Sequence, residues 1–361
     1  MISLFLSSTA SYGQELPELN ELINHERTAK GTPAIAVAVI DSAQIVHLSA
    51  TGYRDLAKKS KVDTDSPFHI CSVSKTVTNM AIFKLVEAGK IDLDADINDY
   101  VSFSIRNPHY PKDRITVRDL LNHRSGIKDN FDIYGPYWNN PQGDPKIELN
   151  DFLRNYLAPD GKLYSKEHFD SKTDYKSFKY SNTGIALLAL LIENVSQQSF
   201  ETFCQKEIFK PMEMNNTSWF LKNLNPKHVV KTYTTSDNGK PLFRGHNGYP
   251  DYPAGQLRTS IADFSKLMTG YLNASDSNFV LAEETVHKIT PNPNIAHQGY
   301  FTWYLTAIND RLYYYHEGGD TGARTVVLMD VIRKNAIIIF TNAEHNLEPL
   351  LREIENQMWN S

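Results

Sequence analysis

The chain has 361 residues, of which 41% are hydrophobic, 22% are charged and 11% are aromatic, and its formal net charge is -5 at pH 7. This composition predicts a globular protein with a core of ordinary size and excludes a largely disordered chain. The small negative charge provides no general attraction to nucleic acid. The two cysteines, Cys71 and Cys204, are too few for a disulfide framework or a zinc site. We therefore expect neither a metal nor a cofactor.

The N-terminal residues, MISLFLSSTASYGQ, form a short apolar run followed by small residues. They resemble a secretion signal cleaved after Gly13, although the basic first region is missing and the apolar core is short. We expect residues 1–13 to be a signal-peptide remnant and the protein to be periplasmic or secreted; the alternative is a cytoplasmic protein with a weakly apolar N-terminus. No stretch reaches the roughly 18–20 apolar residues of a membrane helix, so no integral membrane segment is expected.

The first predicted elements are two strands and a helix. Residues 33–41 and 44–52 are apolar, β-branched runs joined by a polar turn, which predicts a β-hairpin. From Ser72 the periodicity changes to that of a helix ending near Gly89, because apolar residues recur at helical spacing. These residues are Val73, Val77, Met80, Ala81 and Leu85.

Two further helices are predicted at 115–122 and 183–196. Between and after them, Pro, Gly, Asn and Asp are concentrated in segments that predict long loops around a binding site. These segments are 107–113, 129–145, 223–226 and 235–255.

The C-terminal third predicts an antiparallel meander followed by an amphipathic helix at about 347–359. Its strands are expected at 300–308, 311–316, 323–331 and 335–341. Strands at both ends of the chain with helices between them predict one α+β domain over residues 14–361. An antiparallel sheet flanked by helices would be built from about 14–71 and 285–361, with a helical lobe from about 72–284.

Ser72-Val73-Ser74-Lys75 lies where the strand-like segment 67–70 meets a helix. A serine at this point has free backbone N–H groups nearby and lies at the positive end of the helix dipole. Lys75 is one turn further along the same face, and enclosure lowers the pKa of a lysine so that it can accept the serine proton. Ser125-Gly126-Ile127-Lys128 has the same spacing, but it reads as a loop and we set it aside.

Two other motifs accompany Ser72 and Lys75. Tyr180-Ser181-Asn182 precedes the second predicted helix; a phenol near a lysine ammonium is expected to have a lowered pKa and to relay protons, and Asn182 can orient a substrate amide. His316-Glu317-Gly318 ends a strand and is followed by Gly319, and a glycine-rich strand edge lets substrate approach closely. The N–H groups of Ser72 and Gly319 are the candidates for an oxyanion hole.

The ordered set Ser72-x-x-Lys75, Tyr180-x-Asn182 and His316-x-Gly318 resembles the class C β-lactamase and low-molecular-weight penicillin-binding-protein family of serine hydrolases. Further similarity in four segments extends the resemblance over about residues 15–345. These segments are 115–127, 179–192, 253–264 and 316–323. The resemblance implies a β-lactamase/transpeptidase-like fold with the site in a groove between sheet and helical lobe. It also implies that Ser72 is acylated and then deacylated, with Lys75 and Tyr180 as a coupled pair whose general base stays open.

The third motif departs from the Lys-Thr-Gly of the β-lactamases. Members with histidine there include D-Ala-D-Ala carboxypeptidases, D-aminopeptidases and esterase-like hydrolases. Glu317, if it faces the groove, would repel a substrate carboxylate and favour neutral esters or free amines; on a strand it can equally point away. Arg258 and Arg324 are candidate carboxylate contacts, but single arginines more often hold loops.

We therefore predict a serine hydrolase that cleaves a small-molecule or peptide amide or ester, of the D-amino-acid peptidase, carboxypeptidase or esterase type rather than a β-lactamase. Asn182, His316 and Gly318 are expected to contact the substrate. The alternatives are a true β-lactamase and a penicillin- or peptidoglycan-binding module that does not turn over.

Overall fold

The computed structural model describes residues 16–137, 140–275, 278–294 and 301–360 of the chain. The predicted signal remnant, residues 1–13, lies outside the described residues. Within them, no helix is both long enough and apolar enough to cross a membrane.

A seven-stranded antiparallel sheet joins the two ends of the chain, in the order β3-β2-β1-β11-β10-β9-β8. The N-terminal strands are β1 (Ala34–Asp41), β2 (Gln44–Asp55) and β3 (Ser60–Lys61). The C-terminal strands are β8 (Tyr304–Ile308), β9 (Arg311–Asp320), β10 (Ala323–Asp330) and β11 (Asn335–Thr341). The central pairing of β1 with β11 aligns Ile35 with Thr341. The expected hairpin and meander are thus confirmed as parts of one sheet. The strand expected at 300–308 starts only at Tyr304, and residue 300 lies outside the described residues.

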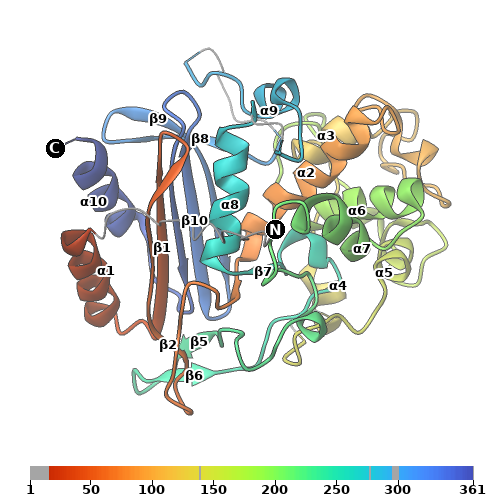
Figure 1. Ribbon diagram of the computed structural model, residues 1–361. Coiled ribbons are helices and arrows are strands. Elements are labelled where there is room, and N and C mark those ends of the chain that lie inside the picture. Colours follow the sequence, from red (N-terminus) through yellow and green to blue (C-terminus); the bar gives the residue numbers. More distant parts are fainter. Residues whose placement is uncertain (1–15, 138–139, 276–277, 295–300, 361) are drawn as a thin grey trace, which may run out of the picture.

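The central strands are buried on both faces, and side-chain size differs between the faces. Alternate residues of β1 point to opposite sides of a sheet. Ile35, Val37 and Val39 pack with α1 (Pro17–Ala29) and α10 (Glu348–Trp359) on what we call the outer face. Ala36 and Ala38 point to the inner face, which belongs to the main core. Figure 1 shows α1 and α10 side by side on the outer face, away from the other helices.

The inner face is covered by α8 (Ile261–Leu272), which packs against β1, β2 and β11. The ring of Phe340 in β11 lies 5.7 Å from that of Phe264 in α8 and 6.1 Å from that of Phe68. The segment 72–284, expected to form the helical lobe, therefore contributes one helix to the layer on the sheet. Small alanines on the inner face of β1 leave room for a helix to approach closely.

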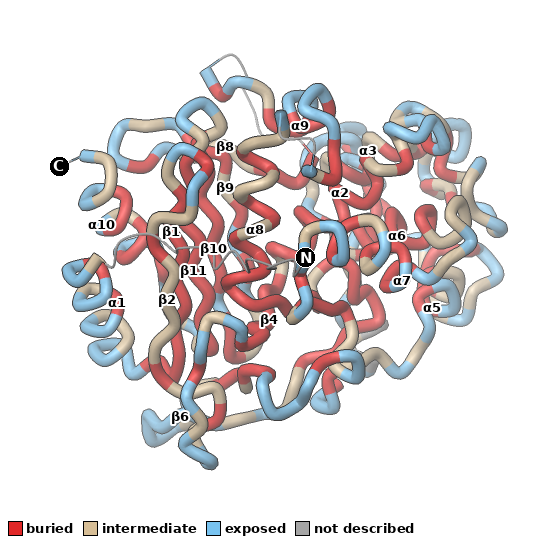
Figure 2. The backbone as a smooth tube through the Cα atoms, in the orientation of Figure 1, coloured by how far each residue is buried: buried red, intermediate tan, exposed pale blue. Residues whose placement is uncertain are grey.

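Several helices pack around α6 (Asn182–Ser196), whose residues from Thr183 to Ile192 are all buried. A helix that is apolar all round requires neighbours on every side. Figure 2 shows this buried centre. The other helices are α2 (Ser74–Glu87), α3 (Val117–Leu121), α4 (Phe131–Tyr134), α5 (Leu149–Leu157), α7 (Phe200–Cys204) and α9 (Glu283–Ile289).

Short elements connect the two layers. One small sheet pairs β4 (Phe68–His69) with β7 (Arg258–Thr259), and another pairs β5 (Tyr233–Thr235) with β6 (Pro241–Phe243). Two single turns matter below: η1 (Cys71–Val73) follows β4, and η7 (Tyr252–Ala254) precedes β7. The other short turns are η2 (Ile97–Asp99), η3 (Gly135–Tyr137), η4 (Lys166–His168), η5 (Gln205–Phe209) and η6 (Leu221–Asn223). The β4–β7 pair therefore brings η1 and η7 together.

Phe340 provides a test of the contact between sheet and α8. Because its side chain is 0% exposed, Phe340→Ala should lower the free energy of unfolding by about 3–5 kcal/mol through lost burial and a residual cavity. Leu312 of β9 is 42% exposed, so Leu312→Ala should change it by less than about 1 kcal/mol. Urea unfolding followed by circular dichroism measures both, and equal losses would contradict the packing described here.

Candidate active site

Ser72 is presented by a sharp turn between β4 and α2. Cys71, directly before it, has a left-handed backbone with φ of 51°. Such a conformation costs a non-glycine residue of order 1–3 kcal/mol, so surrounding contacts must hold it. Those contacts come from both sides: Ile70 N–H donates to Leu257 O (3.0 Å), and Thr325 Oγ1 donates to Ile70 O (2.8 Å). The sequence motif showed a strand meeting a helix but not this strained residue.

Ser72, Lys75 and Tyr180 form one hydrogen-bonded group. Lys75 Nζ lies 3.1 Å from Ser72 Oγ, and the Tyr180 hydroxyl donates to the same oxygen at 2.8 Å. Lys75 Nζ also lies 4.7 Å from the centre of the Tyr180 ring. Residues 108 positions apart are thus brought together at one serine oxygen.

Lys75 is 0% exposed, and its Nζ donates to Ala254 O of η7 at 2.5 Å. Burial lowers the pKa of Lys75 to about 7, although the carboxylates of Asp251 and Asp129 oppose this shift. A substantial neutral fraction at neutral pH leaves a lone pair that can accept the serine proton. Ala254 was outside the predicted site, because a backbone carbonyl carries no sequence signal.

The pKa of Tyr180 moves in the direction opposite to the expected one. The Tyr180 side chain is 42% exposed, but its hydroxyl points to Ser72, where loss of solvent raises the pKa. The Asp129 and Asp251 carboxylates add to the increase, whereas the hydrogen bond to Ser72 opposes it. We expected a lysine ammonium to stabilise the Tyr180 phenolate. That effect is weak because burial makes Lys75 largely lose its own charge. Tyr180 is therefore a neutral phenol that donates a hydrogen bond to Ser72.

Asp129 holds the N-terminus of α6, which carries the second motif. Its carboxylate accepts from Asn182 N–H (2.7 Å), Thr183 N–H (2.9 Å) and Thr183 Oγ1 (2.7 Å). A carboxylate is favourable there because the first N–H groups of a helix have no intrahelical acceptor. The Asn182 side chain makes no hydrogen bond to the described residues. Sequence reasoning missed Asp129, since it is 53 positions from Asn182.

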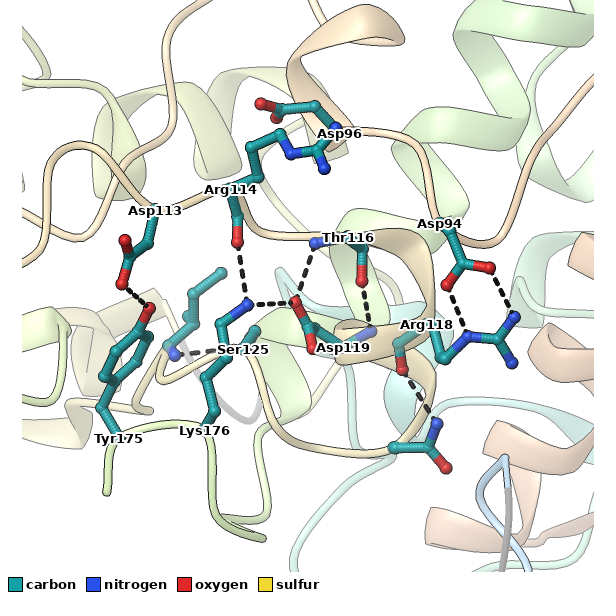
Figure 3. A network of polar contacts seen from close by, with 12 residues as sticks. Asp94, Asp96, Asp113, Arg114, Thr116, Arg118, Asp119, Ser125, Tyr175 and Lys176 are labelled. Carbon is teal, nitrogen blue, oxygen red and sulfur yellow. Dashed lines mark hydrogen bonds and ion pairs between the residues drawn. The ribbon is translucent and has the colours of Figure 1, made fainter. Parts of the chain in front are cut away.

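A polar network fixes the segment before Tyr180 against α3, as Figure 3 shows. Thr116 and Asp119 form a capping box at the start of α3, and Lys176 Nζ donates to Asp119 Oδ2 at 3.1 Å. Beyond α3, His123 Nδ1 accepts from Ser181 N–H (3.2 Å), and its ring lies 4.7 Å from that of Tyr180. His123 is thus a buried structural histidine.

The third motif lies on β9, where alternate residues face opposite sides. His316 is buried, and burial lowers its pKa to about 3. Its Nδ1 lies 2.8 Å from Glu317 O, which can only accept, so the neutral ring carries its proton on Nδ1. His316 therefore brings no positive charge to the site.

Gly318 allows η1 to pack on β9. A β-carbon at this position would lie 2.6 Å from Ile70 O and 2.9 Å from the Cys71 β-carbon. Any side chain would therefore push the nucleophile turn away from the strand. This close approach is the reason for a glycine in the third motif.

Among the described residues, none pairs with one edge of β9 at Gly319. β8 pairs with β9 only as far as Tyr315, whereas β10 pairs with β9 as far as Asp320. Asp320 and Ala323 flank a two-residue turn and form a hydrogen-bonded pair. Hydrogen-bonded and non-hydrogen-bonded pairs alternate along an antiparallel ladder, so the next pair, Gly319 with Arg324, is not hydrogen-bonded. The Gly319 N–H therefore points away from β10, toward the open edge. That edge faces η1, which is compatible with the predicted oxyanion hole of Ser72 and Gly319.

Glu317 points to the outer face, away from His316. It is exposed and accepts from the Tyr315 hydroxyl at 2.8 Å. The sequence left the orientation of Glu317 open; in the structure its side chain lies on the outer face and not beside Lys75 on the inner face.

A cleft of about 930 Å³ contains these groups. Ser72, Tyr180 and His316 line one end, Phe178 and Tyr304 form an aromatic wall, and the cleft continues past Glu317 to the start of α10. Among the described residues, no group of three or more His, Cys, Asp or Glu side chains is arranged to hold a metal ion.

The candidates set aside occupy structural positions. Ser125 Oγ accepts from Ile127 N–H at 3.2 Å, and Lys128 is exposed, so the second Ser-x-x-Lys forms no serine–lysine pair. Arg258 is buried and donates to Asn247 O (2.6 Å) and Gln256 O (3.3 Å), which makes it a loop-fixing residue.

Comparison with known proteins extends the similarity over nearly the whole chain. The family model described as Beta-lactamase matches residues 19–357. Protein flp of Staphylococcus aureus (strain N315) is 24% identical over 341 residues, which cover 93% of this chain and 65% of that protein. The chain therefore spans slightly less than two thirds of the length of this curated relative.

Two solved structures show the same fold. The octameric penicillin-binding protein homologue from Pyrococcus abyssi has a TM-score of 0.76 and 21% identity, covering 96% of this chain and 78% of that one. D-amino acid amidase from Ochrobactrum anthropi SV3 has a TM-score of 0.73 and 20% identity, covering 94% and 98%. The predicted β-lactamase/transpeptidase-like fold is confirmed.

The pKa of Lys75 predicts how Ser72 reactivity changes with pH. Because only neutral Lys75 accepts a proton, the rate of Ser72 modification by a fluorophosphonate should rise with pH and level off above about 7. Lys75→Met should remove this rise, and Lys128→Met should retain it. Rates measured from about pH 5 to 9 by labelling on a gel test this; a flat or falling profile in the unmutated protein would exclude Lys75 as the base.

Proposed function

The chain belongs to the β-lactamase family, and we propose that it is a serine hydrolase that forms an acyl-enzyme on Ser72 and cleaves a small amide or ester. The observation that carries the proposal is the convergence of Lys75 Nζ and the Tyr180 hydroxyl on Ser72 Oγ, at 3.1 and 2.8 Å. A serine oxygen shared by a partly neutral lysine and a phenol is an activated nucleophile with a proton donor beside it.

Acylation begins when Ser72 Oγ attacks the substrate carbonyl carbon and Lys75 accepts the Ser72 proton. The carbonyl oxygen becomes an oxyanion, which the N–H groups of Ser72 and Gly319 stabilise. As the bond to the leaving nitrogen or oxygen breaks, the Tyr180 phenol gives that atom a proton and regains one from Lys75. The products are the acyl-enzyme and a free amine or alcohol.

Deacylation runs the same steps with water as the nucleophile. Neutral Lys75 accepts a water proton through Tyr180 or directly, the tetrahedral intermediate collapses, and Ser72 Oγ leaves with a proton. The two groups titrate as a coupled pair, because each contacts the same oxygen. We assign Lys75 as base and Tyr180 as proton donor, since burial lowers the pKa of the first and raises that of the second.

The neutral His316 favours peptidase or esterase activity over β-lactamase activity. At the position where β-lactamases carry a lysine, this site has no cation to attract a carboxylate close to the scissile bond. The wall of Phe178 and Tyr304, whose rings lie 5.9 Å apart, suits an apolar substituent. The amidase that shares this fold supports an amide substrate, such as a D-amino-acid derivative.

A binding module that does not turn over is the second candidate. The intact contacts among Ser72, Lys75 and Tyr180 argue against it, since a module without chemistry has no need to bury a lysine under a serine. A true β-lactamase is the third candidate and is ranked lower because of His316.

Ser72→Ala tests the nucleophile. It should abolish both hydrolysis and covalent labelling by a fluorophosphonate, while the melting temperature stays within a few degrees of the original. Ser125→Ala, in the second Ser-x-x-Lys, should retain labelling. Full turnover by Ser72→Ala would reject the nucleophile, and failure of the unmutated protein to label or turn over would favour the binding module.

A substrate panel tests the ranking. A chromogenic cephalosporin, a short-chain para-nitrophenyl ester and D-amino-acid amides are compared under one condition. We expect kcat/KM for the ester or an amide to exceed that for the cephalosporin by at least about tenfold, which corresponds to about 1.4 kcal/mol in transition-state stabilisation. Fast cephalosporin hydrolysis with negligible activity on the others would reverse the order.

A further inference from the structure

The cleft that begins at Ser72 crosses the edge of β9 and continues over the outer face of the sheet. Beyond Gly319 it is lined by Arg324 and Val326 of β10, and by Leu347 and Leu351 at the start of α10. Val326 and Leu351 belong to the outer-face core, so this part of the cleft has an apolar floor. It therefore offers a second surface for substrate, beyond the reacting groups.

Arg324 lies directly over Gly319. The two residues are cross-strand partners, and a β-carbon at position 319 would clash with the guanidinium Nη1. Only glycine at 319 leaves this space for the guanidinium, which therefore lies against Gly319 on the outer face of the sheet. Arg324 is exposed and is the only lysine or arginine among the described residues that line this cleft.

The guanidinium of Arg324 has no hydrogen bond or ion pair within the part of the chain that the structure describes, whereas nearby carboxylates are engaged. Glu317 accepts from the Tyr315 hydroxyl (2.8 Å), and Glu344 Oε1 accepts from Gly322 N–H (2.5 Å). Glu348, further along, is paired with Arg352 at 2.8 Å.

Asp320, next to Gly319, is engaged too, because its Oδ1 accepts from Thr321 N–H at 2.6 Å. Arg324 makes no ion pair with Asp320 or with any other described residue, although its charge opposes the burial that raises the pKa of Asp320 to about 6. The acids of this region thus have hydrogen-bond partners of their own, and the guanidinium has no such partner among the described residues.

We propose that Arg324 binds a carboxylate of the substrate on the outer face of the sheet, and this rests on the proposed function. A guanidinium offers a planar pair of donors that matches a carboxylate, and a cation left unpaired beside an apolar floor suits an apolar group that ends in an acid. Because the side chains of Arg324 and His316 lie on opposite faces of the sheet, the carboxylate must be carried on an extended arm rather than close to the scissile bond. The substrate class is then an acidic amide or ester whose acid lies several bonds from the reacting carbonyl.

Matched esters test this assignment. In the first pair, the butyryl esters of meta-hydroxybenzoate and meta-hydroxybenzamide, only the leaving group differs, carrying a charge in one and none in the other. In the second pair, mono-para-nitrophenyl glutarate and its ω-amide, only the acyl group differs in charge. For each pair, the ratio of kcat/KM for the acid to that for the amide is measured. Arg324→Met should lower this ratio about tenfold in one pair or both, Arg324→Lys should restore part of it, and Glu317→Gln should raise it.

Arg154→Met is the matched control, because it removes one exposed positive charge far from the cleft. Arg154 pairs with Asp160 at 2.6 Å and its side chain is 44% exposed. The control should leave both ratios unchanged, and melting temperatures confirm that each variant is folded. Unchanged ratios in Arg324→Met for both pairs would overturn the assignment while leaving the hydrolase intact.

A second measurement does not depend on turnover. The dissociation constants of the same four esters for Ser72→Ala, with and without Arg324→Met, should show the same loss of preference for the acid. If the unmutated protein hydrolyses none of the esters, a preference for the acid that depends on Arg324 would still support the carboxylate site. Its absence would reject the site.

Discussion

The contact between the buried Lys75 amino group and the Ala254 carbonyl is the interaction on which the rest of the site depends. It joins α2, which carries Lys75 and directly follows the η1 turn of Ser72, to η7, which leads through β7 into α8 on the sheet. A lysine buried without an acceptor would cost several kcal/mol, so the position of η7 determines whether Lys75 can be enclosed at all. Parallel contacts support the same junction: Thr78 Oγ1 donates to Pro253 O (2.7 Å), and Leu257 N–H donates to Ser74 Oγ (3.1 Å).

Burial sets the charges around Ser72 more than direct ion pairing does. Lys75 moves toward its neutral form, His316 is neutral, and burial raises the pKa of Asp251 well above its usual range. Both Asp251 carboxyl oxygens are buried and have no hydrogen-bond partner among the described residues. Removing solvent penalises every charged form, so the groups around Ser72 act as hydrogen-bond donors and acceptors that exchange protons without creating stable charges.

Alternate residues of β9 face either the reacting groups around Ser72 or the outer face of the sheet. His316 and Gly318 of β9 face the nucleophile turn, whereas Glu317 and Gly319 face the outer side of the sheet. Since successive side chains of a strand alternate, a four-residue segment both closes the reaction site and starts a charged surface beyond it. Changes at 317 or 324 can therefore alter which substrates bind without moving Ser72.

The sequence by itself determined the sheet built from both ends, the helices that begin near Ser72 and Asn182, and the three motifs, because periodicity and local turn chemistry are properties of neighbouring residues. It did not predict α1, α4, α5, α7, α8 or α9. It also missed Asp129 and Ala254, whose roles come from contacts with Asn182 and Lys75 far away in the chain. The direction of the Tyr180 pKa was wrong for the same reason. A pKa depends on how much solvent the folded chain removes from a group, so only the tertiary structure could decide that Tyr180 stays protonated. The surroundings of a strand depend on which neighbours pair with it. For that reason only the tertiary structure could show that Arg324 lies over Gly319 without an ion-pair partner among the described residues.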